Sequence, residues 1–175
     1  GNIMIREHTF LSSSQDNFRF LRDQYGYAVS DKRLDPGKPW GDGAIEFYSS
    51  KVSLQVQKDC GAFIVLIRPI NEPDISEMSL SWILRALSVS ERVVLPGEVA
   101  PTEYDSVLKI NAQLLKTHCV SIVGGDFSSW LSILEFYVKE SKKGYFARTG
   151  KKIPDRIHQS LEEYIASKKS KGYYP

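Results

Sequence analysis

The chain has 175 residues, of which 42% are hydrophobic and 25% are charged, and its formal net charge at pH 7 is +2. These values are typical of a single globular domain with a buried core. The longest uninterrupted apolar stretch, residues 62–67, is far shorter than the roughly 20 residues of a membrane-spanning helix. We therefore expect no membrane insertion and, because no signal-like apolar region opens the chain, a cytoplasmic protein.

The first predicted element is a helix over about residues 13–25. Ser12 and Gln15 have the spacing of a capping box, and Gly26 supplies a stop. Apolar residues recur at helical intervals up to this stop: Leu11, Phe18, Leu21 and Tyr25. After the stop, β-favouring residues predict an irregular strand over residues 27–33.

A Pro- and Gly-rich stretch, residues 35–43, follows this strand and predicts a loop. It contains Trp40, either exposed or folded back as a lid, and Asp42. Aromatic residues held in loops often anchor protein partners. We therefore name Trp40 and Asp42 as candidate binding residues.

Three apolar runs, residues 44–48, 52–57 and 62–67, predict an antiparallel meander that ends at Pro69. In the middle run, apolar residues alternate with polar ones, which indicates a sheet with one solvated face. Val52, Leu54 and Val56 are expected in the core, whereas Ser53, Gln55 and Gln57 are expected to face solvent or a partner. Gln55 and Gln57 are therefore further candidate binding residues.

Helical spacing returns in the second half of the chain and predicts four more helices. Their expected ranges are residues 77–88, 104–123 and 127–142, and a last helix that opens at Pro154. Gly124-Gly125 is expected to end the second of these, and Asp126 to cap the third. The two glycines with Asp126 and Phe127 partly match a signature of diguanylate cyclases, but its second acidic residue is absent.

The predicted fold is thus α+β, with an antiparallel meander of three or four strands packed against about five helices. Residues 1–143 are expected to form the α+β domain. Residues 144–175 are expected to form a basic helical extension packed on that domain. The whole protein is expected to be a monomer or a homodimer. Residues 1–138 have a net charge of −4 and residues 139–175 a net charge of +6.

Basic residues interleave with aromatic ones in the C-terminal part, as in proteins that bind anionic polymers. The candidate residues for an anionic partner are Lys142, Lys143, Arg148, Lys151 and Lys152. A terminal helix that is simply solvated by its charges explains the same pattern. No recognised nucleic-acid motif accompanies these residues.

The familiar catalytic and metal motifs are missing from the sequence. Cys60 and Cys119 have no CxxC spacing and are interpreted as apolar fillers. His118 and Cys119 are neighbours in sequence, but neighbouring side chains on a helix point apart. We expect no metal and no cofactor, and leave open an unrecognised hydrolase in which acidic residues such as Asp42, Glu46 and Asp59 converge.

Three segments resemble a loose group of uncharacterised bacterial proteins, over most of residues 10–142. The segments are Phe18-Arg-Phe-Leu-Arg-Asp-Gln-Tyr-Gly-Tyr27, residues 44–54, and Gly125-Asp-Phe-Ser-Ser-Trp130. Some proteins of this build look like immunity proteins of bacterial toxin systems, a resemblance that implies inhibition by binding and lends no catalytic residue.

The functional hypothesis is a protein-binding module, with the possibility of an immunity or inhibitor role. The alternatives are a nucleic-acid-associated protein, acting through the basic C-terminal segment, and the hydrolase. The absence of nucleotide loops and triad spacings favours binding over catalysis.

Overall fold

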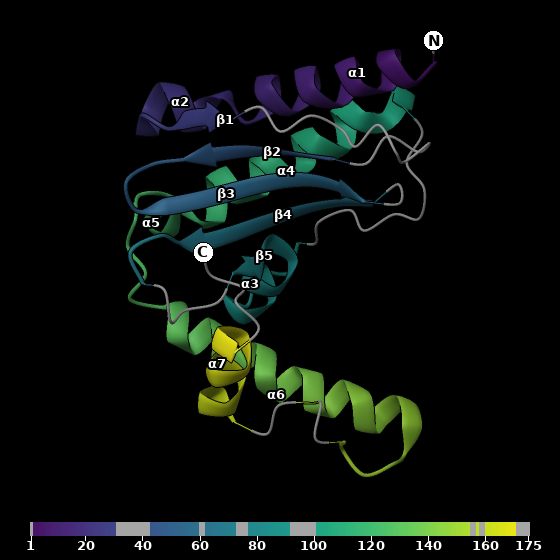
Figure 1. The fold of residues 1–175 in the computed structure, drawn as a ribbon, viewed down its shortest axis with the longest axis vertical. Coiled ribbons are helices and arrows are strands. Elements are labelled where there is room, and N and C mark those ends of the chain that lie inside the picture. Colours follow the sequence, from purple (N-terminus) through teal and green to yellow (C-terminus); the bar gives the residue numbers. More distant parts are fainter. Residues whose placement is uncertain are drawn as a thin grey trace.

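In the computed structural model, a five-stranded antiparallel sheet is packed against helices, which confirms the α+β class (Figure 1). The residues that the structure describes are 2–30, 43–59, 62–72, 77–91, 101–154, 157 and 160–170. Among these residues, no helix is long and apolar enough to span a bilayer.

The strands follow one another in the sheet in the order of the sequence. They are β1 (Ala28–Ser30), β2 (Gly43–Tyr48), β3 (Val52–Asp59), β4 (Ala62–Pro69) and β5 (Met78–Ser79). β2, β3 and β4 confirm the predicted meander, and β4 ends at Pro69 because proline has no amide hydrogen for the ladder. β1 and β5 extend it on either side to five strands.

The described helices are α1 (Asn2–Asn17), α2 (Arg19–Tyr25), α3 (Leu80–Ala86), α4 (Tyr104–His118), α5 (Val120–Val123), α6 (Trp130–Thr149) and α7 (Leu161–Ser170). A short 3-10 turn, Pro101–Glu103, leads into α4. α1 and α4 contact each other, and α4 crosses behind the sheet in Figure 1. No described helix lies over the sheet face that points toward the viewer.

We call these two sides the covered face and the open face. The covered face of β2–β4 consists of Ile45, Phe47, Val52, Leu54, Val56, Lys58, Phe63, Val65 and Ile67, and the open face of Ala44, Glu46, Tyr48, Ser53, Gln55, Gln57, Ile64, Leu66 and Arg68. Val52, Leu54 and Val56 are fully buried, as the alternation predicts. Gln55 and Gln57 are half-buried on the open face. Ser53, also expected to be exposed there, is only 4% exposed, and its hydroxyl donates a hydrogen bond to Glu46.

The first helical region is longer than predicted. α1 begins at Asn2 rather than near residue 13, and Ser12 lies inside it instead of capping it. α1 packs on α4, so tertiary contacts stabilise a segment whose own periodicity is weak. The chain then breaks at Phe18, a fully buried residue, before α2 ends at Gly26 with the expected left-handed φ of 70°.

The predicted helix over residues 77–88 begins later, at Leu80. Met78 and Ser79 instead pair with Ile67 and Leu66 of β4. Ser79 caps the helix, since its Oγ accepts a hydrogen bond from the Trp82 amide at 3.4 Å. Two residues that periodicity alone assigns to a helix are therefore part of the sheet, because they pair with β4.

The helices around the two glycines also differ from expectation. The predicted helix over residues 104–123 breaks at Cys119 into α4 and α5, and α5 ends before Gly124 as predicted. Asp126 does not cap α6: its Oδ1 accepts from the Ser128 amide at 3.0 Å, and α6 begins only at Trp130. The Ser128 hydrogen bond lowers the pKa of Asp126.

The C-terminal helices pack beyond β5, at the edge of the sheet (Figure 1). Trp82 of α3 packs edge-on against Tyr137 of α6, with ring centroids 4.9 Å apart, and Tyr137 packs against the buried Tyr164 of α7 at 5.5 Å. α6 continues to Thr149, so the expected boundary after residue 143 lies inside a helix. α7 begins at Leu161, and Pro154 lies outside it.

Candidate functional site

A chain of polar side chains runs across the open face. Gln57 Nε2 donates to Gln55 Oε1 at 2.8 Å, and Gln55 Nε2 donates to Glu46 Oε2 at 3.2 Å. The Ser53 hydroxyl donates to the same carboxylate oxygen at 3.1 Å. The register explains the grouping, because Glu46 and Gln55 are directly paired across β2 and β3. These hydrogen bonds hold the side chains of the open face in one arrangement.

The next strand brings an apolar row beside this polar row. Ile64 and Leu66 of β4 are directly paired with Gln57 and Gln55, and both are half-buried. β4 is apolar on both faces, whereas β3 is apolar on one. The open face therefore combines an apolar strip with fixed hydrogen-bonding groups, as the centre and rim of protein interfaces do.

The structure thus brings Gln55 and Gln57 together on one surface, with Glu46 as their shared partner. Trp40 and Asp42, the other two predicted binding residues, lie outside the described residues. In the sequence, both residues come directly before β2, whose Glu46 lies on the same surface as Gln55 and Gln57. Their place at the site stays a prediction.

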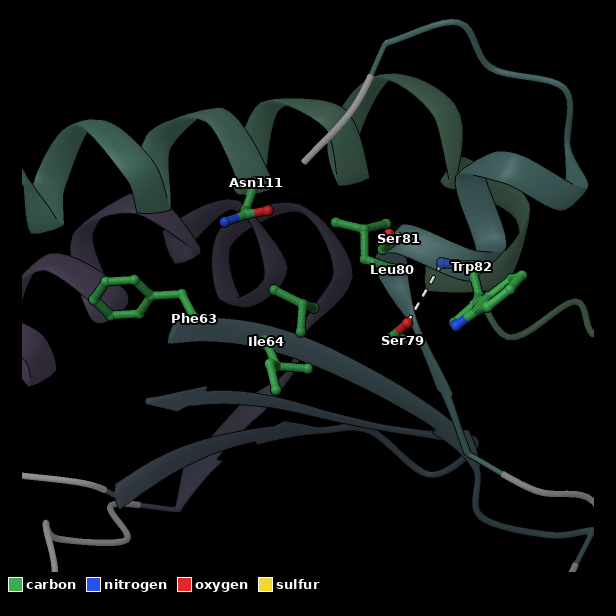
Figure 2. A pocket seen from close by; sticks show the side chains of 8 residues that line it. Phe63, Ile64, Ser79, Leu80, Ser81, Trp82 and Asn111 are labelled. Atoms are coloured by element: carbon green, nitrogen blue, oxygen red, sulfur yellow. Dashed lines mark hydrogen bonds between the residues drawn. The ribbon is translucent and has the colours of Figure 1, made fainter. Parts of the chain in front are cut away.

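A cavity of about 220 Å³ lies between β4, α3 and α4 (Figure 2). It exists because β5 is short: β5 pairs with residues 66 and 67 only, and the chain then turns into α3. Residues 63–65 of β4 consequently have no partner strand on that side in the described part of the chain. The lining residues are Phe63, Ile64, Val65, Ser79, Leu80, Ser81, Trp82 and Asn111.

The two ends of this cavity are held by aromatic contacts. Phe63 stacks on Phe10 with ring centroids 5.7 Å apart and meets Tyr104 edge-on at 5.1 Å. At the other end, the Trp82 ring lies against Tyr137, and the guanidinium carbon of Arg85 lies 4.2 Å from its centroid. Neighbouring side chains therefore hold Phe63 and Trp82 in place at the two ends of the cavity.

The predicted basic residues lie at the far end of α6 and in the turn after it. This end of the helix extends away from the sheet (Figure 1). Lys143, Arg148, Lys151 and Lys152 are exposed, whereas Lys142 is half-buried. Phe146 lies among them with 59% of its surface exposed. Lys143 is 3.5 Å from Glu140, and Arg148 Nε donates to the Gly144 carbonyl at 3.3 Å.

The structure gives no support to a cysteine nucleophile beside His118. Cys119 is 1% exposed, and burial raises the pKa of its thiol to about 12, so the thiol stays protonated at neutral pH. His118 Nε2 instead lies 2.8 Å from Glu91 Oε2. Cys60, Asp42 and the Asp59 side chain lie outside the described residues. No group of three potential metal ligands occurs among the residues that are described.

Asn111 is a site residue that sequence reasoning missed. It is 2% exposed, yet it lies on the apolar stripe of α4 together with Val107, Leu108 and Leu115. A polar residue at a core position of an amphipathic helix was the available signal, since such residues need a reason to be buried.

Comparisons with protein-family models, with curated proteins and with solved structures found no match.

Proposed function

We propose that this protein is a protein-binding module whose contact surface is the open face of the sheet. The observation that carries the proposal is the pre-formed hydrogen-bonded row Gln57–Gln55–Glu46 beside the apolar pair Ile64 and Leu66. Groups that are already ordered lose less conformational entropy on binding than mobile ones. An apolar strip flanked by ordered amides suits a protein surface better than a small substrate.

The loop that precedes β2 adds to this proposal. Trp40 stands three residues before Gly43, so chain length alone keeps it within about 10 Å of the start of the strand. A partner seated on the open face is therefore within reach of the Trp40 side chain. An inhibitor of the immunity type, which acts by covering its target, is one form that such a module takes.

Site-specific photocrosslinking in the source cell tests the proposed surface. A photoreactive amino acid is placed at Gln57 in one variant and, as the control, at Gln113, an exposed residue of α4. We expect a discrete crosslinked protein from position 57 and none from position 113. The same band from both positions, or none from position 57, contradicts the proposal.

The affinity for the captured protein gives a second test. Leu66→Asp places a charge in the apolar strip and should weaken binding at least about 30-fold, the loss typical of a hot-spot residue. Lys109→Asp, on the exposed surface of α4, is the matched control and should leave the affinity unchanged. Equal affinities of the two variants overturn the assignment of the surface.

The far end of α6 supports a second candidate function, binding to a single-stranded nucleic acid. The observation that favours it is the exposed Phe146, which lies among four exposed basic residues, since bases stack on aromatic rings while cations neutralise phosphates. The double variant Lys143→Gln/Arg148→Gln should reduce the salt dependence of DNA binding by about 1.4 in log–log slope. An equal effect of the control Arg22→Gln/Lys109→Gln, or no effect of either, refutes it.

A further inference from the structure

The cavity between β4, α3 and α4 is lined by the side-chain amide of Asn111, whose two polar atoms differ in their partners. Asn111 Nδ2 donates to the Val107 carbonyl at 3.1 Å, one turn earlier in α4. This hydrogen bond identifies which amide atom is the nitrogen and leaves Oδ1 on the other side. In the described part of the chain, Oδ1 accepts no hydrogen bond, although Asn111 is 2% exposed. Figure 2 shows the amide hanging from α4 beside Leu80, at the cavity.

This oxygen is accessible from the cavity. It accepts no hydrogen bond from the described residues, and it does not belong to the fully enclosed side-chain atoms without a partner, which among these residues are represented by Ser14 Oγ alone. Leucine would fill a similar volume on the apolar stripe of α4 but would offer no acceptor. A group that enters the cavity can therefore donate a hydrogen bond to Oδ1 in place of water.

The remaining walls define what kind of molecule fits. Phe63, Val65 and Leu80 are nearly fully buried and present hydrocarbon and aromatic surface. Ser79 and Ser81 place hydroxyl groups at the side where α3 begins. Among the described residues that line the cavity there is no Asp, Glu, Lys or Arg, so none of these side chains balances a charged ligand.

The volume limits the size of the molecule. A cavity of about 220 Å³ has room for roughly seven waters, or for about ten non-hydrogen atoms at the packing density of protein interiors. It is smaller than most drug-binding pockets. A single aromatic ring system or a short branched chain with one polar hydrogen fits it.

We propose that this cavity binds a small, uncharged, largely apolar molecule that donates one hydrogen bond to Asn111 Oδ1. The aromatic contacts behind Phe63 and Trp82 keep the walls in place before the ligand enters, which reduces the entropy lost on binding. The site includes no member of the hydrogen-bonded row of the open face, although Ile64 belongs both to its lining and to the neighbouring apolar strip, and its test needs no protein partner. It therefore holds or fails independently of the proposed protein-binding function.

Indole and indene provide matched probes, because they have nearly the same shape and only indole has an N–H group. Titrations are followed by two-dimensional NMR of the backbone amides of the full chain. We expect saturable shifts at residues 63–65, 79–82 and 111, with a dissociation constant for indole on the order of 0.1–1 mM. Indole should bind about tenfold more tightly than indene. Absence of saturable binding, or equal affinities of the two probes, overturns the proposal.

Two variants and a control locate the interaction. Asn111→Leu should abolish the preference for indole while indene still binds, whereas Gln113→Leu, on the exposed side of the same helix, should leave the preference intact. Ser81→Phe, at the half-buried rim, should fill the cavity and block both probes, which keeps the test decisive if Asn111→Leu does not fold. A preference for indole that survives Asn111→Leu, or binding that survives Ser81→Phe in a folded protein, contradicts the assignment.

Discussion

The covered and open faces of the sheet are made from the same three strands, but they differ in burial: other elements pack on the covered face, whereas no described helix lies over the open face. On the covered face, behind which α4 crosses the sheet, Ile45, Phe47 and Leu54 are fully buried. On the open face, Glu46, Gln55 and Gln57 stay half-buried and bind one another. Residues adjacent in sequence therefore differ in role: one side chain packs in the core, and the next makes polar contacts at the surface.

Polar groups make the difference between the two faces clearer. The covered face also includes Lys58, 3% exposed, whose ammonium lies 5.8 Å from the centroid of the Tyr104 ring. Most polar groups buried on this side of a sheet need a fixed partner, because little water reaches them. On the open face, the side chains of the hydrogen-bonded row bind one another and are half-exposed. Stability is therefore expected to depend mainly on the covered face.

The largest effect is expected from neighbouring residues of β3 that point to opposite faces. Leu54→Ala removes a fully buried side chain and should lower the free energy of unfolding by about 3 kcal/mol, through lost transfer energy and a residual cavity. Gln55→Ala, one residue away, should change it by less than about 1 kcal/mol. Urea denaturation measures both. Similar losses from the two variants refute the division between the faces.

Alkaline pH probes how well the covered side excludes water. Because burial raises the pKa of Cys119 to about 12, the folded state keeps the proton that the unfolded chain loses near pH 9. The stabilisation is complete below pH 9 and declines by about 1.4 kcal/mol per pH unit as the pH rises toward 12. Cys119→Ala should make the stability profile flatter between pH 9 and 11. Parallel profiles of the two proteins argue against a buried thiol.

A smaller loss is expected at the junction between β1 and α5. The Tyr27 hydroxyl donates to the Val123 carbonyl at 2.6 Å, and burial raises the pKa of this hydroxyl well above its usual range. Tyr27→Phe should lower the free energy of unfolding by about 1–2 kcal/mol, because a buried carbonyl loses its donor. Tyr48→Phe, at an exposed position of the open face, is the matched control and should have little effect. Equal losses contradict this reading.

The smallest effect has the opposite sign. Ser14 of α1 is fully buried, and its hydroxyl has no hydrogen-bond partner in the described structure. Ser14→Ala should therefore raise the free energy of unfolding by about 0.5–1 kcal/mol, since it removes an unsatisfied polar group. Ser13→Ala, on the half-buried neighbouring position, should not. A clear loss of stability in Ser14→Ala means that the hydroxyl has a partner after all.

The sequence by itself determined the features that depend on local stereochemistry and on strict alternation. Proline ends β4, glycine ends α2 and α5, and the alternation in β3 assigns its residues to the two faces. It also identified Gln55 and Gln57 as neighbours on one surface. These features follow from backbone geometry and the period of a strand, which operate within a few residues.

Only the tertiary structure decided where helices yield to other contacts and where the cavity lies. Met78 and Ser79 join the sheet because β4 offers unpaired backbone groups, and α1 extends to Asn2 because α4 supports it. The cavity joins Phe63, Ser79 and Asn111, three residues far apart in the chain. Local sequence patterns cannot predict that these three residues line one cavity, because the free energy that brings them together comes from packing between elements rather than from interactions within one element.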